Sequence, residues 1–331
     1  MTEAPSHPRD SYDLLGAEAA EGAFAEAQQR GRLHHAWLLA GPEGVGKATF
    51  AYRAARRLLG AAPDPTRGLL GARPDDPVSR LIAQRAHPDL LVLQRDPEDG
   101  RARKQIPVDE ARELPAFFAK TPAIAAWRVA IIDTANDLNL SGASALLKTL
   151  EEPPERGVIL LVCHRPGALL ATIRSRCRML KLPPVAATEA AAWLSDRLGL
   201  ETEAATQLAA MAKGALGRAW RLAGAGAIAA DTAARDLLAA LPRIDAQAAQ
   251  ALANGFRGGD GGERFDVLIE RLAAQVHDRT CERAAAGEND LEPWAEAFTY
   301  LSALGEQVGA LNLDRADAFY AALARLAAAA C

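Results

Sequence analysis

A glycine-rich loop at residues 41–49 constrains the fold of this 331-residue chain more than any other feature. Its sequence, GPEGVGKAT, matches the pattern G-x-x-x-x-G-K, in which backbone N–H groups surround phosphate oxygens and the lysine adds a positive charge. A short apolar run over residues 33–40 ends at the loop, and an alanine-rich segment with helical periodicity follows it to residue 59. The order strand, glycine loop, helix predicts a P-loop in a parallel α/β sheet.

Further short apolar runs indicate more strands of the same sheet. They are bounded by polar residues, proline or glycine and are too short for helices, so we expect them to be buried strands. Segments with helical periodicity lie between them, and this alternation predicts an open sheet with helices on both faces. The expected strands are residues 90–93, 129–132 and 158–162, and the expected helices are residues 108–118 and 142–150.

The residues needed for ATP hydrolysis are incomplete. The position after Lys47, where a Ser or Thr hydroxyl usually holds Mg²⁺, is Ala48, and Thr49 points about 100° away from it on a helix. Asp133 follows an apolar strand, as a Walker-B aspartate does, but Thr134 stands where many ATPases keep a catalytic glutamate. We therefore expect at most weak ATP or ADP binding and no required cofactor. The candidate nucleotide-binding residues are Gly41, Gly44, Gly46, Lys47, Thr49 and Asp133.

Composition and charge exclude several classes of protein. The net charge of −4 provides no overall positive field for nucleic acid, so any DNA contact needs a local patch or a partner. Neither a signal peptide nor an apolar stretch of about 18 residues is visible, so we expect a cytoplasmic protein with no membrane partner. The cysteines, at positions 163, 177, 281 and 331, contain no CxxC pair, which argues against a disulfide framework and against a zinc site made from cysteines alone.

Breaks in the pattern divide the chain into three expected domains. Pro183 and Pro184 end the α/β pattern, and helical patterns follow, the first with Thr188 as its expected cap and Gly199 as its end. Two more helices are expected within residues 202–223, before glycines at 224 and 226 mark a second break. The expected domains are residues 1–184 (P-loop), 185–225 (three-helix lid) and 226–331 (helical collar).

Two segments contain Gly, Pro and charged residues where loops are expected. Residues 60–88 are predicted to form a surface excursion with a weak helix near residues 78–85, held by packing alone and more mobile than the rest of its domain. Residues 255–262 are expected to separate two helices of the collar.

Three further motifs resemble one family. Residues 145–154 (ALLKTLEEPP) and 175–177 (SRC) are similar to segments shared by the AAA+ clamp-loader subunits of bacterial DNA polymerase III. The lead-in at residues 31–37 (GRLHHAW) is similar to that of the family's delta-prime members. The resemblance covers residues from about 10 to 225, and the order and spacing of the motifs make it specific.

This resemblance implies a non-hydrolysing subunit of a pentameric assembly. Its expected partners are the gamma/tau motor subunits and the delta subunit, and through the assembly the sliding clamp and primed DNA. In the family, the arginine of the Ser-Arg-Cys motif completes the ATP site of the neighbouring subunit in trans, and here that arginine is Arg176. Arg174 and Arg178 flank it and, by strand alternation, are expected on the opposite face.

The sequence departs from the family pattern at three points. Family members usually carry four cysteines of a zinc module before the segment at residues 87–89, whereas this chain has none there, so no zinc is expected. His164 occupies the sensor position of the motors, where we expect a structural hydrogen bond, and Arg218 lies one residue late in the sensor-2 region.

Two other functions remain open. An active gamma/tau-type motor ATPase is supported by Lys47 and Asp133 and opposed by Ala48 and Thr134. A P-loop kinase lacks a visible acceptor-site base and leaves Arg176 unexplained.

Overall fold

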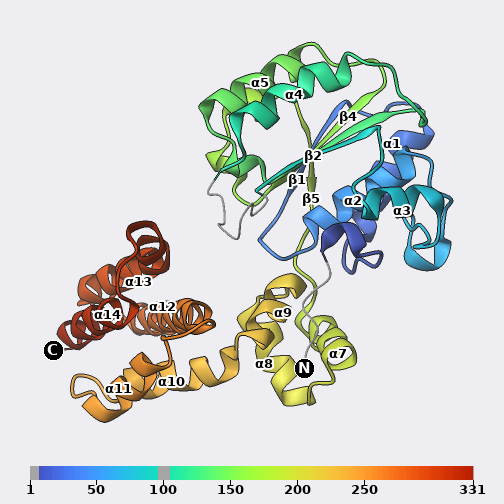
Figure 1. Cartoon of the computed structure of the whole chain (residues 1–331). Helices are drawn as coiled ribbons and strands as arrows, with labels where there is room; N and C mark the ends of the chain where they lie inside the picture. The colour runs from blue at the N-terminus through green and yellow to red at the C-terminus, as the bar shows by residue number, and fades with distance from the viewer. Residues whose placement is uncertain (1–6, 96–104, 331) are drawn as a thin grey trace. The chain divides into compact units, whose positions relative to one another are not determined.

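The computed structural model describes residues 7–95 and 105–330, which form two compact units (Figure 1). The sheet unit contains the described residues up to 199 together with residues 212–219. The helical unit contains residues 200–211 and 220–330. The division into three domains at residues 184 and 225 stays a prediction.

The sheet unit is built on five parallel strands in the order β2-β3-β4-β1-β5. All four strands expected from short apolar runs are present, and the predicted parallel α/β fold is confirmed. Strand β4 is one residue longer at each end than predicted, and its last residue, Cys163, pairs with Ala40 of β1. The strands are β1 (Ala36–Ala40), β2 (Leu90–Gln94), β3 (Arg128–Asp133), β4 (Gly157–Cys163) and β5 (Arg178–Lys181).

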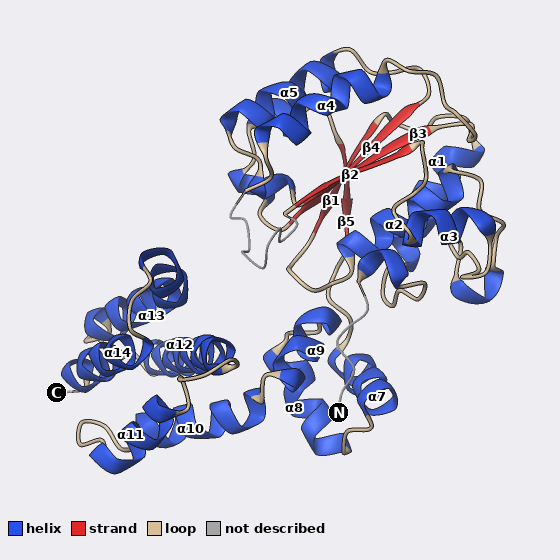
Figure 2. Ribbon diagram, viewed as in Figure 1, coloured by secondary structure: helices blue, strands red, loops and turns tan. Residues whose placement is uncertain are grey.

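Helices cover both faces of the sheet (Figure 2). One face carries α1 (Glu18–Gln29), α2 (Lys47–Leu58) and α3 (Pro77–Ala83), and the other carries α4 (Val108–Phe118) and α5 (Leu140–Glu151). The predicted helix at residues 108–118 is confirmed over its full length, and the one at 142–150 begins two residues earlier, where Asn139 accepts a hydrogen bond from the Gly142 N–H.

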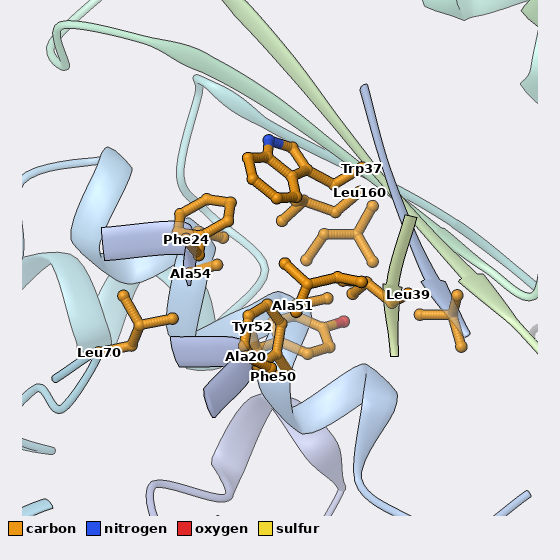
Figure 3. Packing of buried hydrophobic residues seen from close by; sticks show 14 of the residues in the cluster. Ala20, Phe24, Trp37, Leu39, Phe50, Ala51, Tyr52, Ala54, Leu70 and Leu160 are labelled. Atoms are coloured by element: carbon orange, nitrogen blue, oxygen red, sulfur yellow. The ribbon is translucent and has the colours of Figure 1, made fainter. Parts of the chain in front are cut away.

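Alternation along β1 explains why its residues are all apolar. Trp37 and Leu39 pack with Phe24 of α1 and Phe50 of α2 (Figure 3). Ala36 and Leu38 belong to the core on the other face. A parallel strand covered on both faces has no solvent side, so polar residues have no place in it. Each large apolar side chain buried in this way contributes about 1.5–3 kcal/mol.

The segment at residues 60–88 is not held by packing alone, contrary to expectation. Arg53 of α2 and Glu21 of α1 form a buried ion pair at 2.7 Å. Glu21 also accepts a hydrogen bond from the Leu70 N–H at 3.2 Å, and Arg53 donates to the Arg67 carbonyl. The segment therefore supplies polar groups that a buried charge pair requires. It contains a 3-10 helix at Pro65–Arg67 and helix α3, which confirms the weak helix predicted there.

The first helix after the sheet begins earlier than predicted. Helix α7 spans Ala187–Leu198 with Ala186 at its N-cap, so Thr188 lies within the helix and the prediction of a Thr188 cap was wrong. The Val185 N–H donates to the Gly214 carbonyl at 3.0 Å, which holds the chain extended up to that residue and lets the helix start directly after it. Gly199 ends α7 in a left-handed conformation, as predicted. Short helices complete the sheet unit at Pro8–Asp10, Ala135–Asp137, Pro166–Ala168 and Ala171–Arg174 (α6).

The helical unit confirms the predicted all-helical C-terminal part. Phe256, Phe265 and Phe319 form its aromatic core, with ring centroids 5.4 and 5.2 Å apart around Phe256. Asp231 is buried and accepts a hydrogen bond from Arg271 at 2.8 Å. No helix within the described residues is long and apolar enough to span a membrane. The helices are α8 (Thr202–Met211), α9 (Leu216–Gly224, shared with the sheet unit), α10 (Ala227–Ala239), α11 (Ala246–Asn254), α12 (Gly261–Ala285), α13 (Glu292–Leu311) and α14 (Arg315–Ala329).

Candidate functional site

The glycine loop connects β1 to α2 at the carboxyl end of the sheet. Gly44 and Gly46 have φ angles of 83° and 90°, a region that glycine enters without steric cost. A Cβ atom at Gly41 would lie 2.3 Å from the Leu182 carbonyl oxygen, so this position also requires glycine. All three glycines of the predicted loop are thus explained by the local backbone.

Lys47 is the first residue of α2 and is almost completely buried, with 3% of its surface exposed. Its ammonium group donates hydrogen bonds to the carbonyl oxygens of Gly41 at 2.8 Å and Pro42 at 2.6 Å. Burial lowers its pKa to about 8, against the opposing effect of the nearby Glu43 and Asp133 carboxylates. The lysine is therefore bound by its own loop.

The beginning of α9 packs directly against the glycine loop. The Gly217 N–H donates to the Gly44 carbonyl at 2.8 Å, and a Cβ atom at Gly44 would lie 2.5 Å from the backbone nitrogen of Arg218. Both contacts lie within the sheet unit, which contains residues 212–219. The main chain of Arg218 thus lies beside the loop, although the residue is one position late in the motif.

Asp133 ends β3 and lies at the same edge of the sheet as Lys47. Burial raises its pKa above the usual value, while the Lys47 ammonium works in the opposite direction. Thr134 is buried and offers a hydroxyl instead of a carboxylate. Ala48 has no hydroxyl, and Thr49 follows it as the third residue of α2. The donor set for Mg²⁺ is therefore reduced to Asp133, and these residues do not fit a hydrolytic Mg²⁺–ATP centre.

His164 follows β4 and lies near the charged side chains of Lys47 and Glu43. Burial is the largest cause of its lowered pKa, and Lys47 lowers the pKa further. Its backbone N–H donates to the side chain of Asn136 at 2.9 Å, and the Arg165 N–H donates to the same oxygen at 3.2 Å. The side-chain Nδ1 atom of His164 is buried without a hydrogen-bond partner among the described residues, so the expected structural bond of the ring at that atom is not found.

Arg176 lies in the turn between α6 and β5, not in a strand. Its Nη1 atom donates to the Thr172 carbonyl at 3.1 Å, and its Nη2 atom lies 3.0 Å from Glu151 at the end of α5. Arg174 belongs to α6 and donates to the Pro166 carbonyl at 2.9 Å. The prediction that strand alternation relates Arg174 to Arg176 was therefore wrong, because residues 171–174 are helical.

Sheet topology separates Arg176 from the glycine loop. The loop follows the carboxyl end of β1, whereas Arg176 precedes the amino end of β5, its parallel neighbour. Four strand residues, or about 13 Å, lie between these two edges. The structure thus brings Lys47 and Asp133 together, but it places Arg176 at the other edge of the sheet.

Sequence comparison supplies the family. The sequence model of the family described as DNA polymerase III, delta subunit, matches residues 16–186, more than half of the chain. The chain belongs to this family. A DNA polymerase III subunit delta' of Pseudomonas aeruginosa is 38% identical over 62% of this chain, and that of Escherichia coli is 32% identical over 59%. A DNA polymerase III subunit gamma of Buchnera aphidicola is 33% identical over 53% of this chain. The chain spans less than two thirds of the length of these curated relatives, with 61%, 56% and 45% of them covered.

Sequence reasoning missed two residues, Asn136 near the carboxyl edge of the sheet and Glu151 near Arg176 at the opposite edge. Asn136 fixes the backbone after β4, and Glu151 binds Arg176. Asn136 has no motif around it. Glu151 lies inside the segment at residues 145–154, so its motif was visible, but its partner 25 positions away was not.

Proposed function

We propose that this chain is the delta-prime subunit of a bacterial clamp loader, which does not hydrolyse ATP and supplies Arg176 to the ATP site of a neighbouring motor subunit. The observation that carries the proposal is the separation of the two sites: Arg176 lies at the edge of the sheet opposite its own glycine loop. A guanidinium placed there can reach a triphosphate only on another molecule. Membership of the DNA polymerase III delta subunit family supports this role.

The chemistry of Arg176 suits transition-state stabilisation. Charge accumulates on the oxygens of a phosphoryl group during transfer, and a positioned guanidinium neutralises that charge. Such an arginine raises the kcat of related phosphoryl-transfer enzymes by a factor of about 10³–10⁵. The side chain of Arg176 is 37% exposed, which leaves it accessible to a partner.

The chain's own loop is proposed to be a phosphate cradle without catalytic function. Gly41, Gly44, Gly46, Lys47, Thr49 and Asp133 would hold a weakly bound ATP or ADP. Lys47 would have to exchange its bonds to the two loop carbonyls for phosphate oxygens, a cost that weakens binding. The lack of a hydroxyl at Ala48 and of a carboxylate at Thr134 would prevent turnover.

The partners of the proposed subunit are the gamma/tau motors and the delta subunit. Residues 226–331 would act as the collar that holds it in the assembly, and contact with the sliding clamp and primed DNA would occur through the whole complex. Reconstitution with these subunits tests this. Clamp loading on primed DNA should require this chain, and loading at an unchanged rate in its absence would refute the proposal.

The second candidate is an active gamma/tau-type motor ATPase. Lys47 and Asp133 favour it, as does the similarity to DNA polymerase III subunit gamma. An assay of the purified chain separates the two functions. Turnover of ATP at about 1 per second or faster, within the ordinary range of enzymes, would establish the motor function.

A further inference from the structure

We propose that Glu151 is a positioning residue for Arg176, which it holds ready for the phosphates of the neighbouring subunit. The inference rests on the proposed function, since it assigns a role to a second residue of the same trans site. It starts from the 3.0 Å contact between the Glu151 carboxylate and the Arg176 Nη2 atom.

Two acceptors from different elements hold the guanidinium. Glu151 comes from the end of α5, and the Thr172 carbonyl, which accepts from Nη1 at 3.1 Å, comes from α6. Arginine has five N–H donors in one plane, and these two acceptors occupy one on each terminal nitrogen. The plane of the group is fixed, and three donors remain for phosphate oxygens.

The sequence determines where helix α5 ends, and this end is where Glu151 lies. Helix α5 ends at Glu151 because Pro153 and Pro154 follow, and proline cannot continue a helix. Helix α5 also packs against α6, the element that leads into Arg176. The carboxylate is therefore held at the end of a packed helix, and the guanidinium in the short turn between α6 and β5.

The ion pair has little value for stability. The two side chains are 37% and 54% exposed, and exposed pairs contribute about 0–1 kcal/mol. Positioning has a larger effect on rate, because a displacement of about 1 Å can cost about 10²-fold in catalysis. An exposed pair with little effect on folding can thus have a large effect on a neighbour's ATP site.

The carboxylate also has a matched neighbour. Glu152 is the next residue, carries the same charge and is exposed, but it makes no ion pair with any other described residue. Glu152→Gln therefore changes the net charge of this surface by the same amount as Glu151→Gln without removing a contact to Arg176.

A double-mutant cycle in the reconstituted assembly tests the role. DNA-stimulated ATP hydrolysis is measured for Glu151→Gln, Arg176→Ala, the double variant and Glu152→Gln, after gel filtration has shown intact complexes. Glu151→Gln should remove most of the ATP hydrolysis that Arg176→Ala removes. At the ATP site that Arg176 is proposed to complete, kcat should fall about tenfold or more while the KM for ATP stays unchanged. In the Arg176→Ala background it should have no further effect, and Glu152→Gln should behave as the wild type.

The outcomes distinguish this inference from the proposed function. If Glu151→Gln lowers the rate by the same factor with and without Arg176, it acts through the fold and the positioning role is wrong. Wild-type hydrolysis by Glu151→Gln beside a strong loss in Arg176→Ala would also overturn the positioning role alone. If Arg176→Ala itself has no effect, the trans arginine is overturned together with this inference.

Discussion

Replacement of Lys47 by Met tests whether its buried ammonium is held at an energetic cost. The side chain is 3% exposed and bonded to the loop carbonyls of Gly41 and Pro42, and its pKa is lowered from 10.5 to about 8. The difference corresponds to about 3.5 kcal/mol, at about 1.4 kcal/mol per pKa unit. Methionine keeps the unbranched shape of the side chain, although it is one atom shorter, and removes the charge.

The sign of the effect follows from proton binding. Between about pH 8 and pH 10.5 the unfolded wild type holds a proton on Lys47 that the folded protein has lost, so wild-type stability rises with pH in this window. The Met variant has no such group. From about pH 7.5 to about pH 10 the wild type should therefore gain about 2 kcal/mol relative to Lys47→Met.

Urea unfolding at both pH values, followed by tryptophan fluorescence, measures this difference. Lys148→Met is the matched control, since Lys148 is an exposed lysine on α5 of the same unit and its replacement removes the same charge from the surface. A stability difference between wild type and Lys47→Met that stays constant over the pH range would show that the ammonium is not destabilised by burial.

Three further predictions concern the glycine loop, the buried ion pair of Glu21 with Arg53, and zinc. Ala48→Thr should strengthen ATP binding in the presence of Mg²⁺ by about tenfold, or about 1.4 kcal/mol, and calorimetry with and without Mg²⁺ should find no gain without the metal. Glu21→Gln should destabilise the sheet unit by about 3–5 kcal/mol, because it leaves Arg53 buried and unpaired, whereas Glu26→Gln in the exposed pair with Arg30 should cost less than about 1 kcal/mol in the same urea titration. Elemental analysis of the purified protein should find no stoichiometric zinc, because structural zinc takes four ligands and no group of three or more potential ligands exists in the described part of the chain.

Local sequence patterns were sufficient to predict four of the five strands and several of the helices, but not strand β5 or helix α1. The helix at residues 108–118 was found because apolar periodicity and acidic residues in its first turn agree. The strands were found because burial on both faces leaves continuous apolar runs, bounded by residues that break them. These signals depend only on neighbours in the sequence.

Contacts between distant segments were beyond such reasoning. The start of α7 was misplaced because a hydrogen bond from Val185 to Gly214 determines it. The segment at residues 60–88 looked polar and loosely held, since its attachment to Glu21 and Arg53 comes from two other helices. The pairing of Glu151 with Arg176 likewise depends on the packing of α5 against α6.

Arg176→Ala in the reconstituted clamp loader tests the central claim most directly. Total DNA-stimulated ATP hydrolysis should fall only in part, because the proposed motor subunits would keep their own arginines, while the one site that this chain is proposed to complete should lose on the order of 10³-fold in rate. Clamp loading on primed DNA should fall more than total hydrolysis, and Arg174→Ala, with the same change in charge, should retain both rates. Equal and small effects of the two substitutions on both rates would contradict the account and make Arg176 an ordinary surface arginine.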